Sequence, residues 1–315
     1  MPKFQKVVVR APASIANLGP GFDIFGLALE NPYDRVTITS ISEGIRIEVH
    51  GISDNIPVDP SKNTAGVVAG YMLSHFSLKS GVSIRIDKGI PPGSGLGSSA
   101  ASAAAVAFGL DKMFDLKLSY EQLICISAKG EVASAGFEHA DNVSAAICGD
   151  FVIIRSYNPL EVICLKTPPN MGVCVAVPKI PTSPKKTEKA RSILPPVVTM
   201  EKLVHNVGHA ASMAVGFALG DVKLIGRSMC DAVVEPVRSS MIPGYQFVKD
   251  AAMKAGACGV AIGGAGPSMI AIVDEKDSVS LEVMKAMKEG FKKVGIEAEA
   301  FFTKPGRGVS LLEAE

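Results

Sequence analysis

The sequence predicts an α+β fold made of two sheet-and-helix domains, and three observations predict it. Stretches with strand patterns alternate with stretches of helical composition, yet tight hairpins also occur between strands. The chain has 315 residues, which is enough for two domains of ordinary size. Paired prolines in residues 167–170 cannot lie inside a central strand or a helix. We therefore expect domains over 1–166 and 167–315.

The first half is expected to hold both strands and helices. Alternating or β-branched residues predict strands over 6–10, 33–41, 45–50 and 82–87. Residues 11–23 contain two prolines and two glycines, so we expect a loop there. Helices are predicted over 63–76, 98–114 and 119–133, the first with Ser61 or Asn63 near its cap. Ser119 and Gln122 have the spacing of a capping box for the third. Strands 151–155 and 161–166 should pair across residues 158–159.

The second half repeats the mixture of strands and helices. Strands are predicted over 173–177, 259–262, 269–273 and 296–302. Helices are predicted over 186–194, 200–219, 221–229, 244–255 and 280–294. The last helix has apolar residues at helical spacing, so it should cover a sheet with one face.

Composition excludes several classes of partner. The net charge is +1, and the only basic cluster is Lys185-Lys186, so nucleic acid and anionic membranes are not expected to bind. The most apolar window, 100–110, is well short of the ~20 residues of a membrane span. The N-terminus runs straight into a predicted strand, so no signal peptide is expected. Six widely spaced cysteines without a C-x-x-C pair predict buried free thiols in a reducing cytoplasm.

Residues 89–101, GIPPGSGLGSSAA, carry the strongest chemical signal. Gly93, Gly95 and Gly97 allow backbone conformations and close approaches that other residues do not. The helix predicted to follow would offer unpaired amides and hydroxyls in its first turn, which is typical of a phosphate site. The pattern matches neither the Walker sequence, which needs a lysine, nor the dinucleotide fingerprint, which needs a third glycine at Ser98. From these residues alone, a glycine-rich turn into a core helix remains an alternative.

The segment 91–101 resembles the phosphate loop P-x-G-x-G-L-G-S-S-A-A of the GHMP kinases. The resemblance implies the GHMP kinase fold, with nucleotide and substrate sites between the two domains. It also implies ATP binding by Pro91, Pro92, Gly93, Ser94, Gly95, Leu96, Gly97, Ser98, Ser99, Ala100 and Ala101, with Asn63 as a less specific contact to the adenine.

Residues 14–23 resemble S-x-A-N-L-G-x-G-F-D, the form of the first GHMP motif found in homoserine kinases. Within that resemblance, Asn17 contacts the substrate and Asp23 binds its ammonium group. Without it, Asn17 and Asp23 would simply stabilise a turn through bonds to the backbone.

Residues 130–142 resemble the homoserine kinase sequence G-E-x-A-S-x-G-x-x-H-A-D-N. The resemblance implies that Glu131 and Ser99 hold Mg²⁺, that His139 lines the substrate pocket and that Asn142 hydrogen-bonds to the reacting hydroxyl. One carboxylate, a hydroxyl and phosphate oxygens are sufficient for Mg²⁺. The spacing of the acids and His139 does not indicate zinc, and without the resemblance it describes a polar surface.

Two arginines and a glycine loop in the second half complete the resemblance. Arg191 and Arg238 match arginines that bind the substrate carboxylate, and a guanidinium offers paired donors to such a group. By default each would be a solvated surface charge. Residues 263–268, GGAGPS, resemble the third GHMP motif, which is expected to pack beside the phosphate loop.

The function implied is that of an ATP:L-homoserine O-phosphotransferase in threonine biosynthesis, acting as a cytoplasmic homodimer. Phosphoryl transfer depends mainly on alignment and charge neutralisation, so we expect no strong general base, with Asp141 as the rival candidate. Three alternatives remain from the residues: a GHMP kinase for mevalonate or shikimate, a hydride-transferring oxidoreductase, and a non-catalytic regulatory member of the fold.

Overall fold

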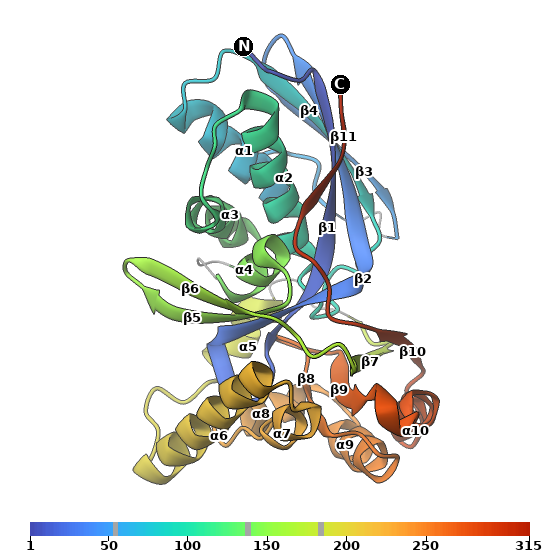
Figure 1. The fold of residues 1–315 in the computed structure, drawn as a ribbon. Helices are drawn as coiled ribbons and strands as arrows, with labels where there is room; N and C mark the ends of the chain where they lie inside the picture. Colours follow the sequence, from blue (N-terminus) through green and yellow to red (C-terminus); the bar gives the residue numbers. More distant parts are fainter. Residues whose placement is uncertain (53–55, 136–139, 182–185) are drawn as a thin grey trace.

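The computed structural model describes residues 1–52, 56–135, 140–181 and 186–315 (Figure 1). The described residues form two lobes, each with a sheet and its own helices, and both termini lie at the far end of the first lobe. No helix in this part of the chain is both long and apolar enough to cross a membrane.

The first sheet has seven strands among the described residues, with the order β11-β1-β2-β4-β3. Their bounds are β1 Lys6–Asn17, β2 Gly21–Ile41, β3 Ile45–Gly51, β4 Gly81–Lys88 and β11 Ser310–Ala314. The hairpin of β5 (Phe151–Tyr157) and β6 (Leu160–Leu165) joins the sheet through the pairing of β5 with the start of β2. All these strands pair antiparallel except β3 with β4.

Helices cover one face of this sheet (Figure 1). They are α1 (Thr64–His75), α2 (Ser98–Phe114), α3 (Tyr120–Ala135) and α4 (Asp141–Cys148). The central helix α2 contacts β1, β2 and the other three helices. Its alanines are fully buried, and their small side chains let the surrounding backbones approach α2 closely. The helix that starts at the glycine loop is therefore the rigid centre of the first domain.

The second sheet has the order β10-β7-β9-β8 and is antiparallel throughout. Its strands are β7 Met171–Pro178, β8 Gly259–Ile262, β9 Met269–Asp274 and β10 Ala298–Thr303. Side chains alternate between two cores, as the period of a strand requires. Cys174 and Ala176 pack toward α9 (Tyr245–Lys254) and α10 (Ser280–Lys292). Val173 and Val175 belong to the core shared with the first domain.

The other helical elements of the second half surround this sheet and the junction between the domains. They are α5 (Lys186–Ser192), α6 (Met200–Leu219), α7 (Val222–Arg227) and α8 (Glu235–Arg238), with 3₁₀ turns at Ser239–Met241 and Glu275–Asp277.

Helix starts with a local signal are confirmed. Asn63 caps α1 by accepting a hydrogen bond from the amide of Ala65 (2.9 Å). The capping box also forms: the Ser119 amide donates to Gln122 Oε1 (2.9 Å), and the Gln122 amide donates to Ser119 Oγ (3.3 Å). These caps form because donor and acceptor lie within three residues of each other.

The loop predicted over 11–23 is wrong for most of its length. Strand β1 continues to Asn17, β2 begins at Gly21, and Ser14 pairs with Ala28. The tight turn between them is made by Asn17, Leu18 and Gly19, all with left-handed φ. The prolines and glycines are placed at bulges and at the turn, so long-range pairing with β2 overrides the local tendency to form a loop.

Three elements and the exposure of several thiols differ from expectation. Helices α4 and α8 and strand β11 have no counterpart among the predictions, and α7 ends at Arg227 rather than at 229. The predicted second domain, 167–315, includes β11, yet this strand pairs with β1 in the first sheet. The cysteines of the described residues form no disulfide, but Cys125, Cys164 and Cys230 are exposed rather than buried.

Candidate active site

The glycine loop forms an open backbone cradle at the start of α2. Gly93, Gly95 and Gly97 all have positive φ, at 71°, 91° and 66°. Helix α2 begins at Ser98, and Gly97 at its N-cap has no side chain with which to cap the first amides. The first hydrogen bond of the helix runs from the Ala101 amide to the Gly97 carbonyl (2.9 Å). The preceding amides are therefore free to bind an anion, which the helix dipole also favours.

The loop 263–268 of the second domain packs directly against this cradle. A Cβ on Gly95 would lie 2.3 Å from the Gly263 carbonyl oxygen and 2.6 Å from that of Gly266. The Ser268 amide also donates to the Ser94 carbonyl (3.1 Å). The structure thus places the third motif beside the phosphate loop, as the sequence predicts. Only glycine at position 95 permits this approach.

Lys186 is a cation at the cradle that the sequence does not reveal. Its ammonium group, at the start of α5, donates to the Gly93 carbonyl (2.5 Å) and to the Gly266 carbonyl. Burial and, to a smaller extent, the nearby charge of Arg238 lower the pKa of Lys186 to about 8. The sequence shows Lys186 only as part of a basic pair, and nothing local places it at the glycine loop, because it comes from a distant helix. A Walker loop has a lysine within its own motif. Here the lysine at the glycine loop comes instead from α5, through the tertiary structure.

Glu131 and Ser99 lie together beneath the cradle. Ser99 Oγ donates to Glu131 Oε2 (3.1 Å), and Glu131 is 6 % exposed. Burial raises the pKa of Glu131 to about 7, and the charge of Asp141 adds to the rise, while Ser99 and Lys88 oppose it. A carboxylate and a hydroxyl at a phosphate site fit Mg²⁺, and a bound cation would offset the cost of burying the charge.

A buried ion pair fixes the backbone on either side of the glycine loop. Lys88 pairs with Asp34 and also donates to the Ser98 carbonyl (2.9 Å) at the start of α2. Asp34 in turn accepts from the amides of Gly89 (3.0 Å) and Ile90 (3.1 Å). Each charge of the pair is thus satisfied by further hydrogen bonds, which such burial requires. The sequence analysis did not identify this pair, whose members lie on different strands.

Asn142 lies where the phosphate loop meets the first hairpin. Its Oδ1 accepts from Ser14 Oγ (3.0 Å), and a Cβ on Gly97 would lie 3.0 Å from the same oxygen. Its backbone amide donates to Asp141 Oδ1 (2.7 Å). Burial raises the pKa of Asp141 to about 7, and the charge of Asp23 adds to the rise. Ser14, which sequence reasoning did not single out, orients the Asn142 amide.

The turn after β1 brings Asn17 and Asp23 together with the third motif. Asn17 Nδ2 donates to the Gly264 carbonyl (3.1 Å), and its Oδ1 accepts from the Asp23 amide (3.2 Å). The Asp23 carbonyl accepts from the hydroxyl of Tyr157, a residue that the sequence analysis did not identify. Both predicted side chains therefore face the junction of the two domains, and Asn17 is fixed at both ends.

The two predicted arginines meet at the same place. Arg191 Nη2 lies 2.7 Å from Asp23 Oδ2. Arg238 is 5 % exposed and donates from Nη1 to the Gly264 carbonyl (3.0 Å) and from Nε to the Ala190 carbonyl (3.2 Å). Both guanidinium groups also lie near the ring of Phe22, at 5.2 and 5.1 Å from its centroid. Cations from α5 and α8 thus converge beside one carboxylate.

The two remaining predicted site residues are Asn63 and His139. Asn63 is buried, and both ends of its amide bind the backbone: Nδ2 donates one hydrogen to the Pro57 carbonyl (2.6 Å), and Oδ1 accepts from the Ala65 amide. The second Nδ2 hydrogen is the donor that an adenine contact could use. His139 lies outside the described residues.

The chain matches known families along most of its length. Residues 63–150 match the model described as GHMP kinases N terminal domain, and residues 213–293 match GHMP kinases C terminal. Homoserine kinase of Methanococcus vannielii is 46 % identical over 314 residues, covering 99 % of this chain and 100 % of that protein. Homoserine kinase of Natronomonas pharaonis is 44 % identical and covers 97 % of this chain and 99 % of its own length.

Solved structures agree with these sequence relatives. The crystal structure of homoserine kinase from Cytophaga hutchinsonii has a TM-score of 0.91 at 35 % identity and covers 98 % of both chains. L. major mevalonate kinase, in complex with R-mevalonate, has a TM-score of 0.75 at 16 % identity and covers 98 % of this chain and 99 % of its own. This second likeness concerns the fold alone.

Proposed function

This chain belongs to the GHMP kinase family, among its homoserine kinases, and on that premise we propose how the site described above works. The chain uses ATP to phosphorylate the side-chain hydroxyl of L-homoserine, giving O-phospho-L-homoserine and ADP for threonine biosynthesis. One observation carries the mechanism: the anion cradle at α2 lies beside a cluster of one carboxylate and two guanidinium groups, which together can pair with a zwitterion.

In our proposal the triphosphate of ATP is bound by residues 91–101. The amides at the start of α2 and of the glycine loop donate to phosphate oxygens and stabilise the charge that develops on the bridging oxygen. Lys186, which already bridges Gly93 and Gly266, turns its ammonium group to the phosphates. Asn63 is kept as the proposed contact to adenine.

Ser99 and Glu131 would hold Mg²⁺ next to the phosphates. Their hydrogen bond of 3.1 Å puts two oxygen ligands together, and the burial of Glu131 favours an adjacent cation. When bound there, such an ion would neutralise negative charge during phosphoryl transfer. The chain's own part is to hold Glu131 beside Ser99 at the first turn of α2, where an adjacent cation would favour the ionised carboxylate.

L-Homoserine is proposed to bind by exchanging ion pairs. The contact between Arg191 and Asp23 would open, the substrate ammonium group would pair with Asp23, and the carboxylate would pair with Arg191 and Arg238. Charge is conserved by this exchange, so little electrostatic free energy is lost. Asn17 stabilises the turn that carries Asp23, and His139 remains a proposed contact of the same pocket.

Asn142 is proposed to hold the reacting hydroxyl by a hydrogen bond. Ser14 occupies its carbonyl oxygen, so the amide group has a fixed orientation at the edge of the phosphate loop. An amide does not take up a proton as a base, and a loose transition state requires mainly alignment. Asp141 is the competing candidate, because a carboxyl with a pKa of about 7 suits general-base catalysis.

We also propose that the protein is a homodimer and that it acts in the cytoplasm. Helix α6 buries only Met213, Gly216 and Phe217 and exposes a row of apolar side chains, among them Val207 and Val215. An apolar helix face of this size is typical of an interface. The free thiols are consistent with a reducing compartment. If the face is an interface, Val207→Glu should lower the mass measured by analytical ultracentrifugation to that of one chain.

The decisive experiment compares substrates in one assay of ADP release. L-Homoserine, L-serine, L-threonine and mevalonate are supplied in turn with ATP and Mg²⁺. We expect kcat/KM for L-homoserine to exceed the others by at least tenfold, because one methylene or one charged group contributes that much discrimination. A higher value for mevalonate, which has no ammonium group, would overturn the pocket assignment. ADP release that ignores the amino acid would overturn the kinase mechanism.

A further inference from the structure

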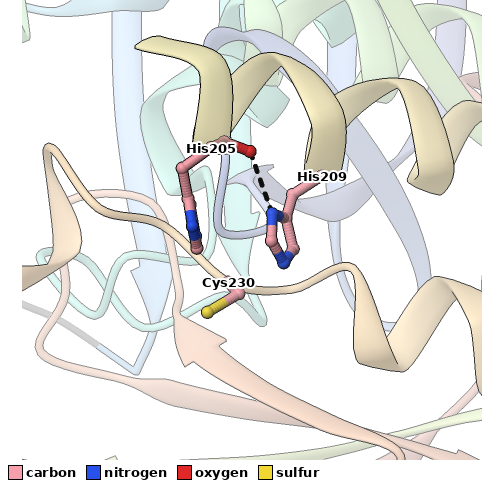
Figure 2. A group of neighbouring side chains, drawn as sticks. All are labelled: His205, His209 and Cys230. Carbon is pink, nitrogen blue, oxygen red and sulfur yellow. Dashed lines mark hydrogen bonds between the residues drawn. The ribbon is translucent and has the colours of Figure 1, made fainter. Parts of the chain in front are cut away.

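A second group of potential ligands lies outside the kinase site, on α6 and the loop after α7. His205 and His209 are separated by one helical turn and lie on the same side of α6, and Cys230 lies opposite them (Figure 2). One ligand atom from each of the three residues lies within 4.8 Å of the others. None of the three takes part in the proposed binding of ATP, Mg²⁺ or L-homoserine. The function proposed above therefore leaves this cluster unexplained.

His209 is held in the way that metal-binding histidines usually are. His209 Nδ1 lies 2.9 Å from the backbone carbonyl of His205, the dashed line in Figure 2. When Nδ1 donates this bond, the lone pair of the ring is on Nε2, which is then free for a metal. The rings are stacked, with centroids 4.1 Å apart and planes 22° apart. This backbone bond fixes both the tautomer and the orientation of His209.

The remaining histidine has a buried nitrogen that lacks a partner. Within the described residues, His205 Nε2 is inaccessible to solvent and makes no hydrogen bond. A buried polar atom in this state costs free energy, which a ligand would recover. A hollow of about 370 Å³ opens beside both histidines and is also lined by Leu224 and Arg227. There is thus room next to the cluster for a water molecule or a small ligand.

Cys230 is held against α6 rather than left on a free loop. Asn206, between the two histidines in sequence, donates from Nδ2 to Asp231 Oδ1 (2.8 Å) and accepts from the Ala232 amide (2.9 Å). Asp231 also accepts from the amides of Val233 (2.8 Å) and Glu235 (2.6 Å). The residue after Cys230 is therefore bonded to the helix that carries both histidines. Hydrogen bonds therefore preorganise His209 and the segment of Cys230, while within the described residues His205 Nε2 is left for a ligand.

We propose that His205, His209 and Cys230 form a binding site for a borderline-soft divalent cation of the Zn²⁺ class. Two imidazole nitrogens and a thiolate are the ligands that such an ion prefers, whereas Mg²⁺ prefers oxygen. The Cys230 thiol loses its proton to solvent when the ion binds, and small side-chain rotations bring the ligands to about 2.0–2.3 Å from the ion. A water molecule from the adjoining hollow fills the fourth position.

The position of the site suggests what the ion would do. A Cβ on Gly19 would lie 3.0 Å from the Met229 carbonyl carbon and 3.4 Å from the Cys230 amide nitrogen. Gly19 is in the turn between Asn17 and Asp23, and Asp231 binds the first amides of α8, the helix of Arg238. An ion on Cys230 would therefore stiffen the segment that lies between two parts of the substrate pocket. Its role is structural, and it does not touch the reacting atoms.

The test uses Co²⁺ as a spectroscopic probe on the metal-free, full-length protein. Thiolate ligation gives an intense sulfur-to-cobalt band in the near ultraviolet, which oxygen ligands at Ser99 and Glu131 cannot produce. We expect this band to saturate at one Co²⁺ per chain and to be displaced by Zn²⁺. Zn²⁺ should also raise the melting temperature, because it binds only the folded state.

Matched variants locate the ion. Cys230→Ser should abolish the band, and His209→Ala should weaken Zn²⁺ binding by about 100-fold or more, since even outer partners contribute 10–100-fold. The controls are Cys164→Ser, an exposed thiol on β6, and His50→Ala, an exposed histidine on β3, and both should bind as the parent does. Circular dichroism verifies that each variant is folded. An undiminished band in Cys230→Ser, or loss of the band in Cys164→Ser, would overturn the assignment.

Discussion

At the scale of single residues, the proposed substrate site contains one charge that is held apart from solvent, that of Arg238. Arg238 is almost fully buried, and its guanidinium is fixed by the carbonyls of Ala190 and Gly264. Burial makes an interaction with a carboxylate stronger than it would be at the surface. Arg238 is therefore not an ordinary surface charge, which supports the proposal that it binds the substrate carboxylate.

Arg238→Ala should affect the two substrates unequally. We expect KM for L-homoserine to rise about 10- to 100-fold, the value of a charge-assisted hydrogen bond, with KM for ATP changed less than threefold. Steady-state kinetics with each substrate varied at saturating concentrations of the other measures both. Lys292→Ala, at an exposed lysine at the end of α10, serves as the control. Equal changes in both KM values would contradict the role of Arg238.

Asp141→Asn should separate a stability cost from a catalytic role. The pKa of this buried carboxyl is raised to about 7, so between about pH 4 and pH 7 the folded state binds more protons than the unfolded state. The stability of the parent therefore falls as pH rises through this range. The variant lacks this cost, so its unfolding free energy relative to the parent should improve by roughly 2–3 kcal/mol from pH 5 to pH 8.

Urea unfolding at the two pH values measures this difference. In the same variant kcat should stay within a few-fold of the parent, because Asn142 and not Asp141 holds the hydroxyl in our proposal. Asn142→Ala is the comparison, with an expected loss in kcat of about 10- to 1,000-fold. A thousandfold loss in Asp141→Asn would instead establish Asp141 as the base.

Lys186 should make ATP binding dependent on pH. Its pKa is lowered to about 8, so the ammonium group that faces the phosphate loop loses its proton as pH rises above that value. KM for ATP should therefore increase between pH 7 and pH 9. Lys186→Met should show a KM at pH 7 that is about tenfold higher and nearly independent of pH over this range. A parent profile that is flat would contradict the assignment.

At the scale of elements, the glycine loop and the third motif act as one unit. Gly95 is in contact with the backbone of Gly263 and Gly266, and Lys186 bridges the same two loops. Neither loop has a regular structure of its own, so each depends on the other for its shape. The cradle is therefore a property of the junction between two domains.

Gly95→Ala should weaken ATP binding because the added Cβ collides with the neighbouring loop, and not only because the φ of Gly95 is positive. The added Cβ would lie 2.3 Å from a backbone carbonyl oxygen, so the loops must separate. We expect KM for ATP to rise at least tenfold, about 1.4 kcal/mol. Gly44→Ala is the matched control, since its φ is also positive, at 78°, but a Cβ there meets no atom within 4 Å. Similar kinetics for the two variants would refute the argument.

At the scale of the whole molecule, the last strand of the chain returns to the first domain. Strand β11 leaves the second domain and pairs with β1 beside the N-terminus (Figure 1). The same β1 carries Ser14 and Asn17 at its other end. The last residues of the chain therefore support the strand on which the substrate pocket is built.

Removal of residues 310–315 should destabilise the fold without abolishing the site. The truncation breaks several backbone hydrogen bonds with β1 and the ion pair between Glu313 and Arg35 (2.8 Å). At about 0.5–1.5 kcal/mol for each hydrogen bond, we expect a melting temperature lower by roughly 5–10 °C. The exposed edge of β1 should also promote aggregation on heating. Differential scanning calorimetry measures both, and an unchanged melting temperature would contradict this role for β11.

The sequence by itself determined the features that depend on near neighbours. Caps at Asn63 and Ser119, and the glycine loop before α2, need only residues a few positions apart, so their patterns can be recognised directly. The tertiary structure alone decided where Lys186 lies, that Arg191 meets Asp23, that residues 11–17 extend a strand, and that β11 joins the first sheet. Each of these depends on contacts between distant segments. The free energy of those contacts outweighs the local secondary-structure preference, and such contacts produce no periodic pattern in the sequence.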